Sequence, residues 1–240
     1  MKKRILVVFL SFILGSLYAQ QNGISITGGI GAYNMQDLRN YQDELITRMP
    51  VNVEGLSYFP SYTNIRLNLF RQYSNGLKYG LVFAYAATGA HANYKDNSGS
   101  LNLDQTISAY RLGISASYQL LQFKAINFMA YGDLGIGYIR DNVNMVISTN
   151  YYYTNNTLIL STFSPQAELG IEALYNINNI SLGIEGGYLF DIGNEFKYGN
   201  QSLPNPNISL LPTSDYKSEL SGFRLGLKFI FWFTNSSQND

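Results

Sequence analysis

The segment 222–233 alternates between two kinds of side chain. Its odd positions, from Phe223 to Phe233, are large and apolar, whereas its even positions include Arg224, Gly226 and Lys228. Successive side chains of a strand point to opposite faces, so this strand has one apolar face and one face with glycine and charge. A barrel in a membrane places the first face in lipid and the second in its lumen. The segment therefore predicts a membrane-crossing strand.

Seven further segments alternate in the same way, at 24–32, 64–69, 77–85, 110–118, 126–138, 163–175 and 180–188. Eight such segments in one chain predict an all-β fold, an eight-stranded antiparallel up-and-down transmembrane β-barrel. A secreted lipocalin-like barrel, with its apolar face around a ligand, is the alternative. The apolar faces are too bulky for so narrow a lumen and the opposite faces are rich in glycine, which favours the membrane barrel.

The connections between these segments alternate in length. Short turns are expected at 74–76, 121–124 and 176–179, and long loops at about 34–61, 89–105, 141–160 and 191–219. Bacterial outer-membrane barrels have short periplasmic turns and long extracellular loops. The pattern therefore predicts four long extracellular loops.

The chain ends define the expected domains. Lys2, Lys3 and Arg4, the apolar run 5–14 and small residues up to Ala19 predict a signal peptide over 1–19, with an N-terminal membrane anchor as the alternative. The barrel then occupies 20–233, and 234–240 form a short polar tail. Removing residues 1–19 from a chain with 16 basic and 16 acidic residues leaves a net charge of −3, which excludes a strongly basic nucleic-acid footprint.

Charged residues recur on the glycine-rich faces, which we assign to the lumen. Isolated buried charges are costly, so these groups must pair or hold water. Pairing predicts a salt-bridged plug, and a polar conduit or proton path is the alternative. The predicted lumen charge network comprises Arg66, Lys78, Arg111, Asp133, Glu168, Glu172, Glu185, Arg224 and Lys228.

Aromatic residues bracket the apolar faces of four segments, eight to twelve residues apart. Ten residues of a tilted strand rise about 25 Å, the height of the lipid-facing band of an outer-membrane barrel. Tyr and Phe favour the headgroup boundary. The predicted aromatic girdle comprises Tyr110, Tyr118, Phe128, Tyr138, Phe163, Tyr175, Phe223 and Phe233.

The signal peptide, eight alternating segments, short turns and Phe-rich last strand resemble the small outer-membrane β-barrels of Gram-negative bacteria, of the OmpA/OmpX type and the bacteroidete outer membrane β-barrel domain family. The resemblance implies a monomer in the outer membrane that contacts its lipids and is inserted by its insertion machinery. In that family the terminal Phe often ends the chain, whereas here Phe233 precedes a seven-residue tail. We expect a non-enzymatic role: structural, or adhesion to a host or surface ligand through the loops.

Some barrels of this kind modify lipid A, so an outer-membrane lipid-modifying enzyme is the alternative function, and a narrow ion pathway is another. The one histidine, His91, has Asn93 where a deacylase has its serine. Ser98 and Ser100 lie near His91 in the sequence, but Ser is common in loops. We therefore expect no catalytic residue. A single His and no Cys also predict no metal site and no cofactor.

Two parts of the expected loops have a pattern of their own. In 35–49, Leu38, Tyr41, Leu45 and Ile46 recur at helical spacing before Pro50, which fits either a short amphipathic helix or a polar loop. Tyr151, Tyr152 and Tyr153, and the Pro-rich stretch 200–212, mark either a surface that binds sugar or protein or strands that extend above the membrane.

Overall fold

The computed structural model describes residues 21–47, 54–55, 61–198 and 216–233. The predicted signal peptide 1–19, the tail 234–240, Pro50 and the stretch 200–212 lie outside these ranges. In the described residues, no helix has the length and the apolar character needed to cross a membrane.

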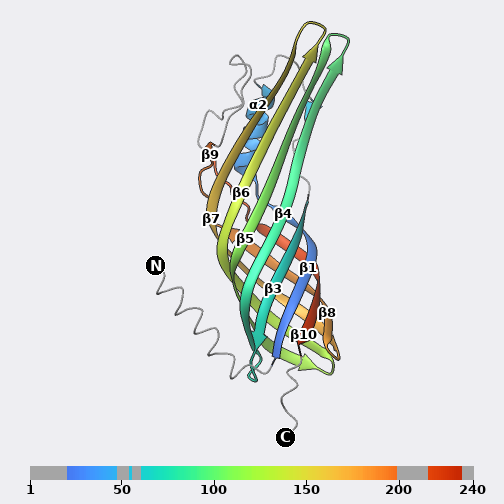
Figure 1. Ribbon diagram of the computed structural model, residues 1–240, viewed down its shortest axis with the longest axis vertical. Helices are drawn as coiled ribbons and strands as arrows, with labels where there is room; N and C mark the ends of the chain where they lie inside the picture. The colour runs from blue at the N-terminus through green and yellow to red at the C-terminus, as the bar shows by residue number, and fades with distance from the viewer. Residues whose placement is uncertain (1–20, 48–53, 56–60, 199–215, 234–240) are drawn as a thin grey trace.

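Eight long antiparallel strands of the described chain close into a ring (Figure 1). Each of these strands pairs with the next long strand along the chain. The last strand pairs with the first, so that Ile24 lies opposite Phe231. The predicted up-and-down barrel is confirmed. The strands are β1 (Gln21–Tyr33), β3 (Tyr62–Gln72), β4 (Leu77–Asp96), β5 (Gly99–Phe123), β6 (Ile126–Thr149), β7 (Tyr153–Ile177), β8 (Ile180–Asp191) and β10 (Gly222–Phe233).

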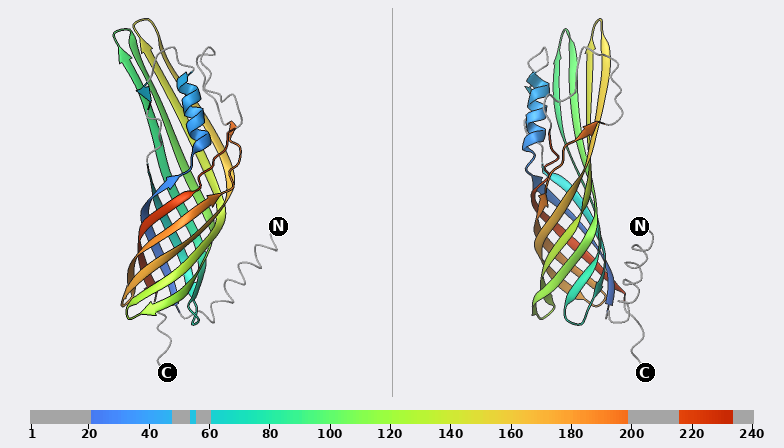
Figure 2. Two further views of the ribbon diagram at one scale, coloured as in Figure 1. Left: turned by 180° about the vertical axis from the view of Figure 1, so that it is seen from behind. Right: turned by 90° about the vertical axis from the view of Figure 1, so that its left-hand side faces the viewer.

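The three expected short turns lie together at the end of the barrel opposite the long hairpins (Figure 2). Gly76, Lys124 and Asn178 have positive φ angles of 80°, 53° and 51°, as tight hairpin turns require. The turn expected at 121–124 is shifted, because β5 runs on to Phe123 after a register shift between Gln119 and Leu121.

Two of the four expected loops are strands instead. The segments 89–105 and 141–160 fall in the β4–β5 and β6–β7 hairpins, which pair continuously to their tips at Asp96–Gly99 and Ser148–Tyr153. These hairpins project well beyond the rest of the barrel (Figures 1 and 2). The other two connections contain short elements: α2 (Gln36–Thr47), β2 (Glu54–Gly55) and β9 (Lys197–Tyr198).

The projecting hairpins keep their alternation but exchange the character of their faces. On β5, Leu112 points outward and is 56% exposed, whereas Leu103, nine residues away and on the opposite face, is fully buried. The inner face therefore changes from charged to apolar beyond the barrel. Because lipid surrounds only the barrel, the outer face no longer needs to be apolar there.

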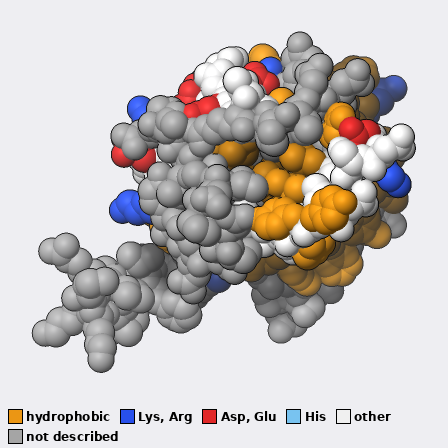
Figure 3. All heavy atoms as spheres, turned by 90° about the horizontal axis from the view of Figure 1, so that it is seen from above, with side chains coloured by type: hydrophobic (Ala, Val, Ile, Leu, Met, Phe, Trp, Pro, Cys, Tyr) orange, Lys and Arg blue, Asp and Glu red, His pale blue; other side chains and the backbone are white. Residues whose placement is uncertain are grey.

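This apolar inner face packs under a cap. Helix α2 buries Leu38, Tyr41 and Leu45, which confirms the amphipathic helix. The negative charge of Asp37 in its first turn stabilises the helix through a favourable interaction with the helix dipole. The segment 216–221 adds Tyr216 and Leu220 to the same core. Seen from the hairpin end, hydrophobic side chains gather in the middle of this surface (Figure 3). A small apolar core on the side of the long hairpins thus covers the barrel mouth.

Candidate functional site

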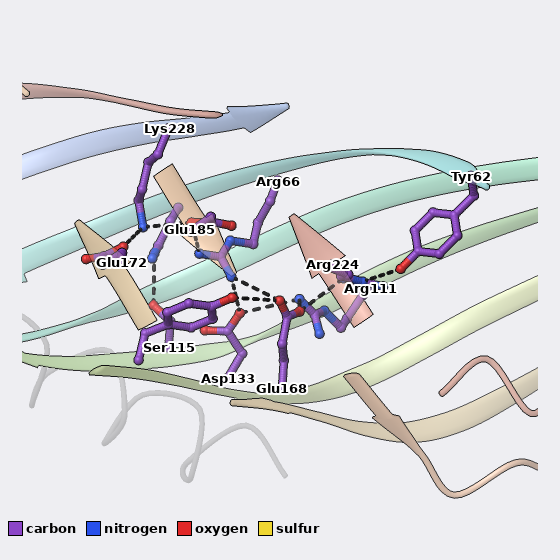
Figure 4. A network of polar contacts seen from close by, with 12 residues as sticks. Tyr62, Arg66, Arg111, Ser115, Asp133, Glu168, Glu172, Glu185, Arg224 and Lys228 are labelled. Carbon is purple, nitrogen blue, oxygen red and sulfur yellow. Dashed lines mark hydrogen bonds and ion pairs between the residues drawn. The ribbon is translucent and has the colours of Figure 1, made fainter. Parts of the chain in front are cut away.

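The predicted lumen charges all lie inside the barrel, and eight of the nine take part in one linked set of ion pairs (Figure 4). They come from six strands, and their side chains are at most 10% exposed. Strand alternation places each of them on the inner face, while the closure of the ring brings distant strands together.

Glu168 is the centre of this network. Its Oε2 accepts hydrogen bonds from Arg111 Nη2 at 2.6 Å and from Arg224 Nη1 at 3.0 Å. Its Oε1 accepts one from the Tyr131 hydroxyl at 3.1 Å and lies 3.5 Å from Arg66 Nη1. Three guanidinium groups thus share one carboxylate, as charge-assisted pairs that offset the cost of burial.

Other carboxylates connect these guanidinium groups to Lys228. Arg66 contacts Asp133 at 3.1 Å and Glu185 at 2.7 Å. The Lys228 ammonium lies 3.3 Å from Glu185 and also donates to Glu172. The interior is therefore held by ion pairs that cross the lumen.

Lys78 differs from the other eight. Among the residues that the structure describes, its ammonium has no carboxylate within ion-pair distance, and it lies 4.8 Å from the ring centroid of Trp232 and 5.5 Å from that of Phe70. Both distances suit cation–π contacts. Phe70 and Trp232 pack with a small buried cluster of Met129, Leu174 and Ile230. Lys78 therefore lies in the predicted lumen but outside the linked ion pairs, because the turn end of the lumen is filled by apolar and aromatic side chains.

Two stacked tyrosines close the other end of the ionic layer. Tyr33 and Tyr62 have ring centroids 3.6 Å apart, and both hydroxyls accept hydrogen bonds from Arg224, at 3.0 and 2.7 Å. Both rings also belong to the buried apolar cluster under the cap, the cap core, which continues from them towards the hairpin tips. The lumen therefore contains an aromatic layer, an ionic layer and a tyrosine layer in succession. Sequence alternation alone identified only the ionic layer.

The predicted aromatic girdle residues all lie on the outer surface. Tyr85, Tyr110, Tyr138 and Phe163 are direct cross-strand neighbours on four adjacent strands, and they form a continuous row on the side of the long hairpins. Tyr85 is not among the predicted girdle residues, although it points outward on β4 like Leu81 and Phe83. Tyr118, Phe128, Tyr175 and Phe233 are exposed towards the short turns, and Phe223 is 72% exposed.

His91 lies on the outer face of the β4–β5 hairpin, beyond the aromatic row. Its Nδ1 contacts the Asp104 carboxylate, and its Nε2 lies 3.3 Å from the Asn93 amide nitrogen. Ser98 is at the hairpin tip, where its hydroxyl donates to Asp96. The histidine thus has an acidic partner, but an amide lies where a nucleophile would be needed. In the described chain no three His, Cys, Asp or Glu side chains cluster as metal ligands would.

A buried carboxylate under the cap was not predicted. Asp141 is fully buried on β6, three residues beyond Tyr138 on the side of the long hairpins. Its Oδ2 accepts hydrogen bonds from Gln105 at 2.8 Å and from the Tyr216 hydroxyl at 2.7 Å. Burial raises the pKa of Asp141 to about 6, although the two hydrogen bonds act in the opposite direction. Its cover comes from segments distant in sequence, so no local pattern marks it.

No protein-family model and no curated protein match the chain. Solved outer-membrane proteins resemble it at low identity. The attachment invasion locus protein Ail of Yersinia pestis, in complex with the heparin analogue sucrose octasulfate, is 12% identical over 89% of this chain and 99% of its own, with a TM-score of 0.41. A major outer membrane protein from Thermus thermophilus is 13% identical over 88% and 99%, with a TM-score of 0.46. Neisserial surface protein A is 11% identical over 90% and 98%, with a TM-score of 0.34.

The class of protein follows from the strand pairing and the two faces of the chain itself. A closed ring of eight antiparallel strands has an apolar outer band, an aromatic row and a charged interior. The chain has the architecture of a small transmembrane β-barrel of the outer membrane.

Proposed function

We propose that this barrel is a non-enzymatic cell-surface protein that binds a protein or carbohydrate ligand through its projecting hairpins. The observation that carries the proposal is the tyrosine cluster at the tip of the β6–β7 hairpin. Tyr151, Tyr152 and Tyr153 are 99%, 41% and 67% exposed. Tyr combines a large apolar surface with a polar hydroxyl and is enriched at binding sites.

The hairpins are suited to presenting such a cluster. About eleven residues of each strand continue beyond the aromatic row, which corresponds to roughly 36 Å along the strand. The cap core holds their inner faces, so the tip is carried by a braced sheet. A binding surface that is already ordered loses less conformational entropy on association.

The filled lumen favours this proposal over an ion pathway. Ion pairs cross the middle layer, and aromatic side chains occupy the layers on both sides. An eight-stranded barrel is only wide enough for its own side chains. The pairing of His91 with Asn93 favours it over lipid modification, because no hydroxyl lies at the second ring nitrogen.

The test uses cells of a non-adherent Gram-negative host that express the full chain. Their binding to arrays of glycans and extracellular-matrix proteins is compared with that of cells expressing the triple variant Tyr151→Ser, Tyr152→Ser and Tyr153→Ser. The matched control replaces the exposed tip residues Asn150 and Asn155 by Ser. We expect wild-type and control cells to bind the same probe, and cells with the triple variant to bind that probe at least tenfold less. Equal binding by the triple variant, or no binding to any probe by correctly folded wild type, would refute the proposal.

A further inference from the structure

The outer wall of the barrel is hollowed below the aromatic row. A groove of about 560 Å³ is lined mainly by outward-facing residues of β3 to β7. The row Tyr85, Tyr110, Tyr138 and Phe163 forms its upper part, and Leu112 and Ile136 lie one step lower on their strands. The volume is in the range of about 300–1,000 Å³ typical of small-molecule sites. Because the groove is in the lipid-facing band on the hairpin side, it faces the outer leaflet.

A second cavity of about 720 Å³, lined mostly by polar and charged residues, adjoins the groove at Phe163, which lines both. Ser161, Asn194, Glu195, Lys197 and Lys217 contribute to its wall. The cavity exists because β8 leaves the edge of β7 above Gln166 and the short strand β9 pairs there instead.

Arg140 lies on the same level as this cavity. It is the cross-strand partner of Ser161, which is in turn the partner of Lys197. Neighbouring strands are about 4.8 Å apart, so Arg140 and Lys197 start about 10 Å from each other and can reach a common ligand. Arg140, Lys197 and Lys217 are exposed, and within the described ranges none of them forms an ion pair with a carboxylate. With Glu195 as the one acidic group in the cavity wall, the cluster has a net positive charge.

We propose that the groove and the cationic cavity form one binding site for an anionic, phosphate-bearing lipid of the outer leaflet. An acyl chain lies against the aromatic row and the side chains below it, and headgroup phosphate contacts Arg140, Lys197 and Lys217. The groove alone gives no hydrophobic preference for any lipid, because all lipid tails are equally apolar. Selectivity therefore rests on the cations, and Arg pairs with phosphate through two parallel hydrogen bonds.

The test measures lipid retention by native mass spectrometry on the purified full chain in detergent. Phosphatidylglycerol is the probe, and monogalactosyl diacylglycerol with the same acyl chains is the phosphate-free comparison. We expect one tightly retained phosphatidylglycerol per barrel and at least tenfold weaker retention of the galactolipid. Equal retention of both lipids would overturn the proposal, because it would mean that the barrel binds lipids without selecting for phosphate.

Variants separate the two parts of the site. Arg140→Gln with Lys197→Gln should weaken phosphatidylglycerol retention at least tenfold and leave the galactolipid unchanged. Lys95→Gln removes an exposed cation near the tip of the same wall and should change neither. Ile136→Trp, which fills the groove, should weaken both lipids. Equal effects of the cation variant and Lys95→Gln, or complete displacement of the lipid by excess inorganic phosphate, would contradict a lipid site.

Discussion

The carboxylate of Asp141 gives a quantitative prediction for the stability of the cap. Burial raises its pKa from 3.8 to about 6, so the folded cap holds this proton more tightly than the open form does. Stability then falls as pH rises from about 4 to 6 and stays constant above that, because the folded state binds more protons in this interval. A pKa difference of this size corresponds to about 3 kcal/mol. The variant Asp141→Asn should therefore stabilise the closed cap at neutral pH.

Hydrogen exchange of the segment 216–221 measures this directly. The Ser218 amide donates to the Asn194 carbonyl at 3.1 Å, and the Leu220 amide donates to Asp191 at 3.1 Å. Both hydrogen bonds depend on the closed cap. After correction for the intrinsic effect of pH, their protection in the wild type should fall roughly a hundredfold between pH 4 and pH 7.

In Asp141→Asn this pH dependence should disappear, and protection at pH 7 should match or exceed that of the wild type. The control is Asp96→Asn at the exposed hairpin tip, where hydrogen bonds from Ser98 and Tyr94 lower the aspartate pKa to about 2. That variant should leave the cap amides unchanged. Flat wild-type protection over this pH range, or faster exchange in Asp141→Asn at pH 7, would refute the reasoning.

Two further predictions concern the lumen and the exposed histidine. Glu168→Gln removes the carboxylate shared by three guanidinium groups, and it should lower the free energy of unfolding by about 3–5 kcal/mol. The readout is the urea midpoint at which the compact band of unboiled protein disappears on a gel, with exposed Asp104→Asn as the control; an unchanged midpoint in Glu168→Gln would count against the network. His91→Ala should leave the lipid A mass spectrum of expressing cells unaltered, and a modified species that depends on His91 would show that the barrel is an enzyme.

Alternation predicted the barrel well because lipid imposes one rule on every strand. Wherever lipid surrounds the wall, outward residues such as Leu112 are apolar, and in the ionic layer inward residues such as Arg111 are charged. Loops are expected at 89–105 and 141–160 because the rule reverses beyond the aromatic row, although strands above the membrane are one of the two interpretations of Tyr151, Tyr152 and Tyr153. Leu103 points to the same inner face of β5 as Arg111, but it is apolar. In the sequence it therefore interrupts the membrane pattern, although the strand continues through it.

The alternation of side chains along each strand also predicted which charges face the lumen, but not which of them pair. Arg66 on β3 pairs with Glu185 on β8 across the barrel, and that contact depends on the register of strands that are not neighbours. The same limit explains Lys78, whose cation–π partner Trp232 lies on β10. Such pairs become visible only when the ring is closed.

The reversal of the two faces at the aromatic row is the central claim, and single cysteines on β5 test it most directly. The chain contains no cysteine, so each substitution labels one site. Intact cells are treated with a membrane-impermeant maleimide. We expect labelling of Asp104→Cys, on the exposed outer face of the hairpin, and none of Leu112→Cys in lipid or of Leu103→Cys under the cap. Labelling of Leu112→Cys from water, or protection of Asp104→Cys, would contradict the account.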